Sequence, residues 1–400
     1  MIKSSKITLK YSNKNKITKL NDFIIEYQIV VKTFIDLIWG AENLKPLLDK
    51  NYTQKINSWL SQRAIQCAGK QASAIVRGCK TKQNKRLYII NKLNKEGQFK
   101  KARKLKAIYD KNTVSKPDVN IIEPELDSRF VKISLGSPTS FDGWITLTSL
   151  GNKLNIKIPF KRHKHFNKML EQGIIKNGVR ISKNKITMMF DLPEPTQTTK
   201  GKILGIDIGQ KTTLSCSNGK TIESDPHGHT YRSICNKLAR RKKDSKAFKR
   251  TQKQRSNYIH WCVNQVDLSN IKQVNLENIK HLRRYKRTRR SLSHWNYGEL
   301  FDVLESKLIG SGVQIHKVNP TYTSQRCSNC GWVCKSNRKL KKFQCAKCGF
   351  TADADLNAST NLSLNLIPLG YQKHLSKDNR LGFYWNLIGQ ESIVPDALKV

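Results

Sequence analysis

Two Cys-x-x-Cys pairs, Cys327 to Cys330 and Cys345 to Cys348, constrain this 400-residue chain more than any other feature of its sequence. The two-residue spacer lets both sulfurs of a pair turn toward one ion, so two pairs suit a tetrahedral Zn²⁺. Because all four ligand positions are thiolates, the predicted ion is structural and not hydrolytic. The alternative is that the four are ordinary buried or redox-active cysteines.

The other six of the ten cysteines show no ligand spacing. Cys334 lies in the loop between the two pairs and is expected to stay outside the metal site. Five further cysteines are expected to be packing residues: Cys67, Cys79, Cys216, Cys235 and Cys262. Since no small disulfide framework is present, cysteine usage favours a reducing compartment.

The charge of the chain is strongly one-sided, with 74 Lys and Arg against 29 Asp and Glu and a formal net charge of +45. Self-repulsion of this size does not help a fold, so a polyanionic partner, nucleic acid, is the natural explanation. The most apolar stretch, 23–39, is interrupted by charged residues, and residues 1–10 lack the apolar core of a signal peptide. We therefore expect a cytoplasmic, nucleoid-associated prokaryotic protein with no membrane partner.

Two basic runs mark the expected nucleic-acid contacts. Nine Lys and Arg lie between residues 240 and 255, and seven of the eleven residues from 280 to 290 are Lys or Arg. A charge run is often only a solvated face, but the charge of the whole chain favours phosphate contacts. The candidate contact residues are Arg240, Arg241, Lys242, Lys243, Arg283, Arg284, Lys286, Arg287, Arg289 and Arg290.

Apolar periodicity divides the chain into helical, β-rich and mixed segments. A stripe at helical spacing from Leu20 to Ile38 and a second helical stretch near 53–78 predict a basic helical block. Short alternating runs between 129 and 192 predict a small antiparallel barrel, and 193–201 is the expected linker. From Lys202 onward, strands mixed with helices indicate an α/β domain.

Asp207 and Glu277 are acids within or at the end of apolar strands. Desolvating a carboxylate is costly unless it is paired or binds a metal, and strand alternation turns Asp207 away from its apolar neighbours. The alternative for Asp207 is a strand-end residue that caps a turn or pairs with an arginine. For Glu277 the alternative is a solvated glutamate at a strand end.

Asp353 and Asp355 follow the second cysteine pair. Helical positions two apart diverge by roughly 200°, so only one of the two can face a shared site. Asp353 has a competing role as helix N-cap, so the spacing favours Asp355. Together with Asp207 and Glu277 this gives three acids, and phosphodiester hydrolysis uses such acids to hold two Mg²⁺ ions about 3.5–4 Å apart. No GxxxxGK[ST] loop is present, which argues against an ATP-driven motor.

Five motifs then occur in order: Gly205-Ile-Asp207-Ile-Gly209, Leu276-Glu277-Asn278-Ile279, Pro320-Thr-Tyr-Thr-Ser-Gln-Arg-Cys327-Ser-Asn-Cys330-Gly331, Cys345-Ala-Lys-Cys348-Gly349 and Asp355-Leu-Asn357-Ala358. In these motifs the chain resembles TnpB, the RNA-guided nuclease encoded by insertion sequences, and its relatives, the miniature type V CRISPR effectors. The motifs cover about 203–362, and the residues before them match the family only in architecture.

The resemblance implies a multidomain α+β fold in which a helical recognition part and a β-barrel wedge precede an RNase H-like (RuvC) nuclease domain with an inserted zinc ribbon. It makes Asp207, Glu277 and Asp355 the catalytic Mg²⁺ ligands, and the four paired cysteines the zinc ligands. The expected boundaries are 1–15 and 115–195 for the wedge, 16–114 for the recognition domain, 202–323 and 351–366 for the nuclease, 324–350 for the ribbon and 367–400 for a tail.

The function implied by the resemblance is RNA-guided DNA cleavage by a transposable element, with guide RNA and target DNA as partners. The cofactors would be structural Zn²⁺, catalytic Mg²⁺ and the guide RNA, with a monomer or homodimer on one RNA. A miniature type V CRISPR effector, a DNA transposase and a non-cleaving nucleic-acid-binding protein remain as alternatives. Retention of all three candidate carboxylates argues against the non-cleaving protein.

Overall fold

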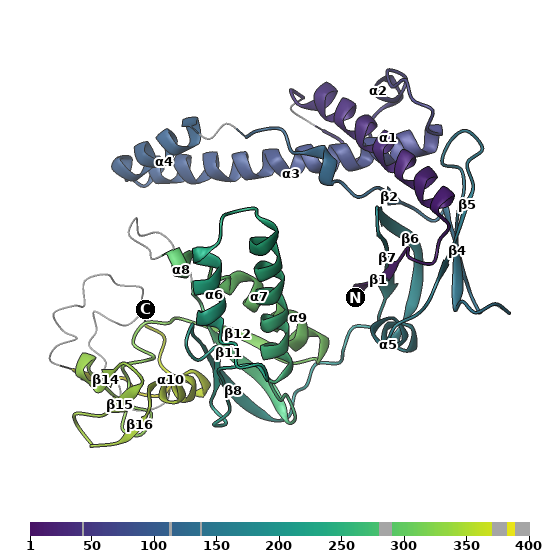
Figure 1. Ribbon diagram of the computed structural model, residues 1–400. Coiled ribbons are helices and arrows are strands. Elements are labelled where there is room, and N and C mark those ends of the chain that lie inside the picture. Colours follow the sequence, from purple (N-terminus) through teal and green to yellow (C-terminus); the bar gives the residue numbers. More distant parts are fainter. Residues whose placement is uncertain (42–43, 112–113, 137, 280–289, 370–381, 389–400) are drawn as a thin grey trace. The chain divides into compact units, whose positions relative to one another are not determined.

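The computed structural model describes residues 1–41, 44–111, 114–136, 138–279, 290–369 and 382–388. The chain forms two compact units, Met1–Pro193 and Glu194–Val400 (Figure 1). Their boundary lies at the start of the linker expected at 193–201. Each unit combines helices with sheets, so the predicted mixed α/β multidomain fold is confirmed.

The helices of the first unit are α1 (Lys14–Ile38), α2 (Lys50–Thr53), α3 (Gln62–Lys95), α4 (Phe99–Lys111) and α5 (Lys164–Gln172), with a 3₁₀ turn η1 (Val119–Ile121). The apolar stripe of α1 is buried from Leu20 to Ile38, as predicted. The second predicted helix begins later than expected, because Ser61 Oγ caps α3 by accepting a hydrogen bond from Ala64 N at 3.1 Å.

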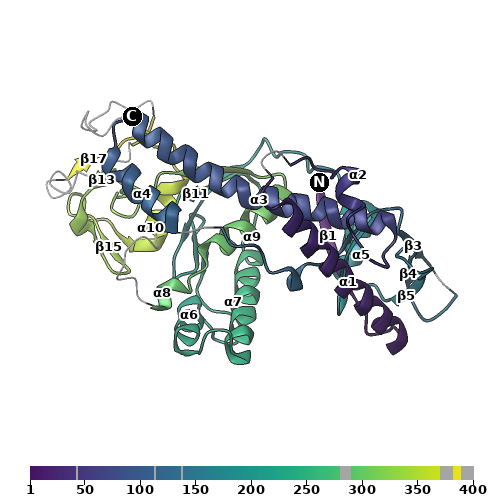
Figure 2. The same cartoon turned by 90° about the horizontal axis from the view of Figure 1, so that it is seen from above.

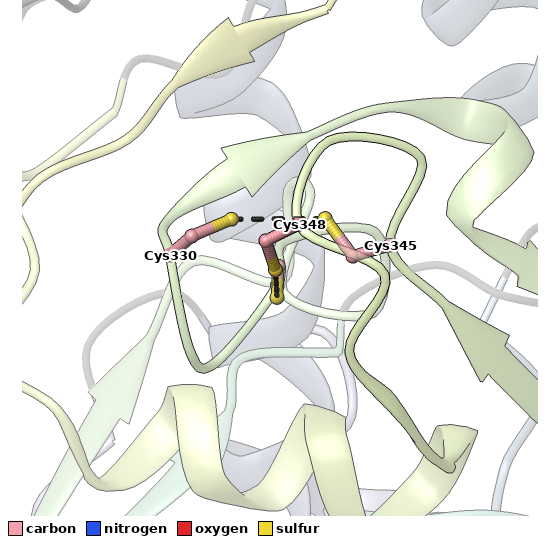
Figure 3. A group of neighbouring side chains, drawn as sticks. Cys330, Cys345 and Cys348 are labelled. Carbon is pink, nitrogen blue, oxygen red and sulfur yellow. Dashed lines mark hydrogen bonds between the residues drawn. The ribbon is translucent and has the colours of Figure 1, made fainter.

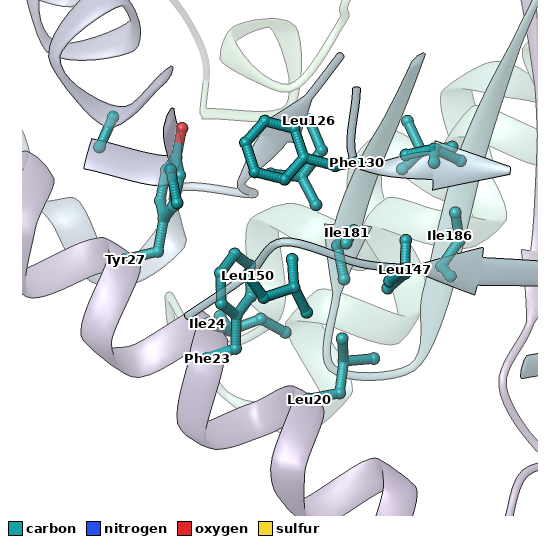
Figure 4. Close-up of a cluster of buried hydrophobic side chains, with 14 of the residues drawn as sticks. Leu20, Phe23, Ile24, Tyr27, Leu126, Phe130, Leu147, Leu150, Ile181 and Ile186 are labelled. Carbon is teal, nitrogen blue, oxygen red and sulfur yellow. The ribbon is translucent and has the colours of Figure 1, made fainter. Parts of the chain in front are cut away.

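The strands of the first unit form two antiparallel sheets. One has the order β1 (Ile2–Thr8), β7 (Lys185–Asp191), β6 (Ile174–Ser182) and β2 (Glu125–Leu126), and the other has the order β3 (Val131–Leu135), β4 (Gly143–Leu147) and β5 (Ile156–Phe160). Figure 4 shows side chains of α1 packed against residues of both sheets in one hydrophobic core: Leu20, Phe23, Ile24, Tyr27, Leu126, Phe130, Leu147, Leu150, Ile181 and Ile186. The helical part and the strands therefore share a core. Closure of the strands into a barrel stays a prediction.

The second unit is built on a five-stranded sheet in the order β10 (Thr221–Ile222), β9 (Leu214–Cys216), β8 (Lys202–Ile208), β11 (Ile271–Glu277) and β12 (Gln314–Val318). The last three of these strands run parallel, whereas β9 is antiparallel to β8 and β10 to β9. Its helices are α6 (Tyr231–Arg240), α7 (Lys246–Asn264), α8 (Arg290–Ser293), α9 (Tyr297–Gly310) and α10 (Ala354–Ser363). Figure 2 shows α6 and α7 side by side.

The pleat of β8 and β11 gives the sheet two different faces. Alternate apolar residues share a core with α6, α7 and α9: Leu204, Ile206, Ile208, Val274 and Leu276. The intervening positions face α10. A Cβ on Gly205 would lie only 2.0 Å from Ser359 O, and Asn275 Nδ2 donates a hydrogen bond to Leu362 O at 2.7 Å. The helix therefore lies directly on the strands.

The cysteine region of the second unit consists of short elements. A three-stranded sheet contains β14 (Arg338–Lys339), β15 (Lys342–Gln344) and β16 (Thr351–Asp353), after a 3₁₀ turn η2 (Lys335–Asn337). A separate two-stranded sheet pairs β13 (Trp332–Val333) with β17 (Phe383–Tyr384). Among the helices that the structure describes, none has the length and apolar character required to span a membrane.

Replacing Gly205 with Ala is expected to destabilise the second unit by roughly 1–3 kcal/mol, because the added methyl group forces α10 away from β8. Thermal unfolding followed by circular dichroism measures the change. Gly78→Ala is the matched control, since a Cβ at this exposed α3 position meets no atom within 4 Å. Equal melting temperatures for the two variants would contradict the close packing of α10.

Candidate active site and metal cluster

The four paired cysteines converge as the sequence predicts. Their sulfur atoms all lie within 4.8 Å of one another, with Cys327 Sγ 3.8 Å from Cys348 Sγ and Cys330 Sγ 3.6 Å from Cys345 Sγ. Figure 3 shows Cys330, Cys345 and Cys348 pointing toward one another. A tetrahedral site with zinc–sulfur bonds of about 2.3 Å has sulfur–sulfur distances of about 3.8 Å. The cluster therefore has the dimensions of a four-thiolate zinc site.

The two Cys-x-x-Cys turns have the same backbone structure. Gly331 N donates to Cys327 O at 2.9 Å, and Gly349 N donates to Cys345 O at 3.0 Å. Both glycines have positive φ, 81° and 73°, which other residues adopt only with strain. A hydrogen bond from the backbone of Phe350 lowers the pKa of Cys348 to about 6, which favours the thiolate that a metal requires. These residues fit zinc.

The cysteines outside the pairs are also placed as expected. Cys334 Sγ lies 3.0 Å from Ser336 Oγ and is not part of the cluster. Cys216, Cys235 and Cys262 are buried, and burial raises the pKa of Cys216 and of Cys262 to about 11. Burial also raises the pKa of the half-buried Cys67. These shifts favour unreactive thiols.

Asp207, Glu277 and Asp355 come from three elements that meet at one edge of the sheet. Leu276 pairs with Ile206 in the parallel register, so Asp207 and Glu277 follow as neighbours on β8 and β11. Both acids lie at positions that face α10, and Asp355 belongs to the first turn of that helix. Parallel strands and one helix N-terminus thus place three acids together that are far apart in sequence.

Asp207 is the carboxylate whose ionisation reports the other two acids. Burial, followed by the negative charges of Glu277 and Asp355, raises the pKa of Asp207 from 3.8 to about 8. Burial also raises the pKa of Glu277. Like-charge shifts of this kind arise only between close groups. The carboxylate oxygens lie farther apart than the cysteine sulfurs. Within the described residues, only the four cysteines bring three or more candidate ligand atoms within 4.8 Å of one another.

Two residues that the sequence did not single out contact these carboxylates. Thr323 Oγ1 donates to Glu277 Oε1 at 2.6 Å, and Arg338 Nη2 donates to Asp355 Oδ1 at 2.7 Å. The positive charge of Arg338 also offsets part of the rise that burial causes in the pKa of Asp207 and of Glu277. The Thr-Ser-Gln-Arg-Cys motif that contains Thr323 was a signal for it, whereas Arg338 had none.

Asp353 has the role that helix geometry predicted. Its Oδ1 accepts hydrogen bonds from Asp355 N at 2.9 Å and Leu356 N at 3.1 Å, so it is the N-cap of α10. This cap occupies Asp353 and fixes the turn that carries Asp355. The preference for Asp355 as the third acid of the site is consistent with this structure.

Buried hydrogen bonds join the first cysteine pair to α10. Asn357 Nδ2 donates to Arg326 O at 2.8 Å, and Asn357 Oδ1 accepts from Ser328 N at 3.0 Å. One turn later, Asn361 accepts from Arg326 Nη1 at 2.7 Å and donates to Thr323 O at 2.9 Å. The cysteine cluster is therefore tied to the helix that carries Asp355 and to the threonine that contacts Glu277.

The structure describes half of the predicted nucleic-acid contacts. Arg240, Lys242 and Lys243 are exposed at the end of α6 and in the following loop, and the exposed Arg290 donates to Arg241 O at 3.3 Å. Five of the predicted residues lie outside the described part of the chain: Arg283, Arg284, Lys286, Arg287 and Arg289. The role of all ten residues stays a prediction.

Known proteins share sequence with the part of the chain that contains the cysteine pairs and Asp355. Residues 297–362, which include Asp355 and the cysteines, match the Cas12f1-like TNB domain. A 76-residue segment is 40% identical to the CRISPR-associated endodeoxyribonuclease Cas12f1 of Sulfoacidibacillus thermotolerans, over 19% of this chain and 18% of the relative. The putative RNA-guided DNA endonuclease InsQ of Escherichia coli is 39% identical over 74 residues, 18% of each chain.

A TnpB-like protein of Methanocaldococcus jannaschii is 33% identical over 97 residues, 24% of this chain and 32% of the relative. The resemblance to TnpB and Cas12f1 proteins is confirmed. Each of these matches spans less than a third of the relative's own length. The fold is also similar to that of the mini-RNA-guided endonuclease CRISPR-Cas phi3, with a TM-score of 0.55 at 11% identity over 91% of this chain and 92% of the other.

Cys348→Ser is expected to lose bound zinc, because three thiolates and a hydroxyl form a weaker site, and to melt at a lower temperature. Metal content is measured by inductively coupled plasma mass spectrometry. Cys334→Ser is the control and should retain zinc, since its sulfur lies outside the cluster. Full zinc content in the Cys348 variant would contradict the assignment.

Asp207→Asn is expected to gain stability over the natural chain as pH rises in magnesium-free buffer. The folded pKa of about 8 exceeds the ordinary 3.8, so the contribution of Asp207 to stability is present in acid and is lost as pH rises through about 8. Asn does not titrate, so the difference in melting temperature should widen between about pH 5 and about pH 9, and added Mg²⁺ should reduce it.

Asp267→Asn is the control for this titration. Hydrogen bonds from Ser269 lower the pKa of Asp267, so its replacement should not reproduce the trend. Parallel pH profiles for the natural chain and Asp207→Asn would contradict the proximity of the carboxylates.

Proposed function

We propose that this chain is an RNA-guided DNA endonuclease of a transposable element, and that it hydrolyses phosphodiester bonds at a RuvC-type site. The observation that carries the proposal is the convergence of Asp207, Glu277 and Asp355 beside a four-cysteine cluster. The names of two relatives support it, since one is an endodeoxyribonuclease and the other a putative RNA-guided DNA endonuclease.

The sheet of the second unit supports an RNase H-like nuclease domain. Three antiparallel strands, β10, β9 and β8, are followed by two strands parallel to β8, and α10 packs on the face that carries the acids. We assign 202–323 and 351–366 to this domain and 324–350 to a zinc ribbon inserted in it. In the first unit we assign 16–114 to guide and target recognition, and 1–15 with 115–195 to the barrel-like wedge.

The donor set of the site suits Mg²⁺. Three carboxylates are hard oxygen ligands, and the raised pKa of Asp207 reflects negative charge that a divalent cation would offset. Asp207, Glu277 and Asp355 would hold the ions, and bound Mg²⁺ would supply Lewis acidity and an activated water. Zinc held by four thiolates would have no open position and would serve only to stabilise the ribbon.

The chain's own residues prepare this site. Thr323 holds one oxygen of Glu277 and thereby fixes its rotamer, while the cap at Asp353 fixes the turn that presents Asp355. Arg338 contributes a positive charge next to Asp355, where it could attract a DNA phosphate toward the three acids. The hydrogen bonds of Asn357 fix the position of the ribbon relative to this helix turn.

The net charge of +45 supports a guide RNA and target DNA as partners. A protein that holds an RNA–DNA hybrid through its backbone needs many cations, while base pairing supplies sequence recognition. The exposed Arg240, Lys242, Lys243 and Arg290 are candidates for such backbone contacts.

A miniature type V CRISPR effector is the second candidate, because the Cas12f1-like match covers the same cysteines and the same third carboxylate. Both candidates would use one site and one chemistry. The gene neighbourhood separates them, since a repeat array beside the gene supports the effector and transposon ends support the element-encoded nuclease.

Asp207→Ala is expected to reduce guide-dependent DNA cleavage to background without reducing RNA binding, because it removes a metal ligand and no phosphate contact. The assay uses protein purified with its bound RNA, which is sequenced to define the target, and scores DNA cutting in Mg²⁺. Asp302→Ala, which removes an exposed acid of α9, should cut normally. Undiminished cutting by Asp207→Ala would overturn the proposed function.

A further inference from the structure

The outer face of the three-stranded sheet in the first unit carries one large aromatic ring, the indole of Trp144. Along β4, Gly143, Ile145 and Leu147 are buried, while Trp144 and Thr146 alternate with them and remain partly exposed. Trp144 is therefore on the face of the sheet that points away from the core. A large indole on this outer face is not needed to complete the core.

Two more rings continue this surface from Trp144. Phe141 lies with its ring centroid 5.6 Å from that of Trp144, and Tyr11 lies 5.8 Å from Phe141. All three rings are partly exposed. Tyr11 comes from the segment after β1, 130 or more residues away in sequence, so the fold assembles the row from separate parts of the chain.

Three exposed lysines lie over the same rings. Lys157 Nζ is 4.8 Å from the centroid of Trp144, and Lys10 Nζ and Lys161 Nζ are 4.8 Å and 5.9 Å from that of Tyr11. A few basic side chains elsewhere in this unit form ion pairs, as Lys116 does with Asp36. Among the described residues, the three lysines over the rings take part in no ion pair.

Among the described residues, Asp142, the acid next to Phe141 in sequence, forms no ion pair with these lysines. The Asp142 carboxylate accepts a hydrogen bond from Arg162 N at 2.6 Å and so serves the hairpin that carries Phe141. A surface of half-exposed rings bordered by unpaired ammonium groups matches the chemistry of unpaired nucleotides, whose bases have flat faces and whose phosphates are anionic. A protein partner would need acidic side chains in place of the phosphates.

We propose that this platform, formed by Tyr11, Phe141, Trp144, Lys10, Lys157 and Lys161, binds unpaired bases of the guide RNA by stacking and holds their phosphates through the lysines. The assignment to RNA rests on the proposed function. The platform belongs to the first unit, whereas the three carboxylates belong to the second. Unpaired RNA segments are recognised mainly by stacking on aromatic side chains.

Photo-cross-linking tests the platform directly. A short single-stranded RNA containing 4-thiouridine is mixed with a DNA of equivalent sequence containing 4-thiothymidine, and the full-length Asp207→Ala protein is irradiated with both in magnesium-free buffer. RNA cross-links mapped by mass spectrometry to peptides containing Phe141 or Trp144 are the expected result. RNA cross-links only elsewhere, or platform cross-links to DNA alone, would overturn the proposal.

Binding of the same RNA measures the contribution of the rings. Phe141→Leu and Trp144→Leu keep an apolar cover on the sheet but remove the stacking surface, and each should weaken binding roughly tenfold with little change in its salt dependence. An RNA of the same length with abasic sites should bind the natural chain and the variants alike. Lys157→Gln should instead lower the salt slope by about one.

Matched controls keep the outcome independent of folding and of cleavage. Tyr88→Leu removes a 68% exposed ring of α3, and this variant should bind RNA like the natural chain. Lys168→Gln removes an exposed charge of α5, and this variant should keep the platform cross-links. Melting temperatures confirm that each variant is folded. Because no cleavage is scored, loss of the platform and loss of the nuclease function give separate results.

Discussion

Burial of Asp207 beside two other carboxylates is the constraint around which the second unit is organised. A carboxylate that is partly buried beside two others raises the free energy of the folded chain at neutral pH, as the pKa of about 8 for Asp207 shows. The fold holds the acids together through contacts on their backbones. The parallel pairing of β8 with β11 places two of them, and the close approach of α10 to Gly205 places the third.

The segment that carries the first cysteine pair also holds α10 in place. Asn357 and Asn361 lie one turn apart on α10 and contact the segment that leads into Cys327. The same segment contains Thr323, whose hydroxyl contacts Glu277. A shift of the ribbon would therefore move a helix turn and a strand end together. This connection accounts for the position of the four-cysteine cluster beside the three carboxylates.

Sequence patterns located the acids because local rules decide their positions. Strand alternation placed Asp207 and Glu277 away from the apolar face, and helix geometry separated Asp355 from Asp353, the N-cap. The cysteine pairs were equally clear because their spacing is local. Such features depend on the few residues that precede and follow them.

Features that depend on tertiary contacts were not visible in the sequence. Arg338 lies in a basic stretch that resembles any solvated surface, and its partner is 17 residues away. Strand β6 lacks a regular alternation because a register shift interrupts its pairing with β7 between Lys176 and Val179. The aromatic platform needs Tyr11 beside Phe141, a proximity that no local pattern encodes.

Arg338 shows how charge and scaffold are combined. Its side chain is 30% exposed and contacts the side chain of Asp355, which is 13% exposed, so solvent screens this ion pair less than one on the surface. The arginine belongs to β14 of the ribbon, whereas the acid belongs to α10. Lys341, in the next turn of the ribbon, pairs with Glu223 after β10. Two cations of the cysteine region thus contact two acids outside it, and the positive charge of Arg338 offsets part of the rise that burial causes in the pKa of Asp207.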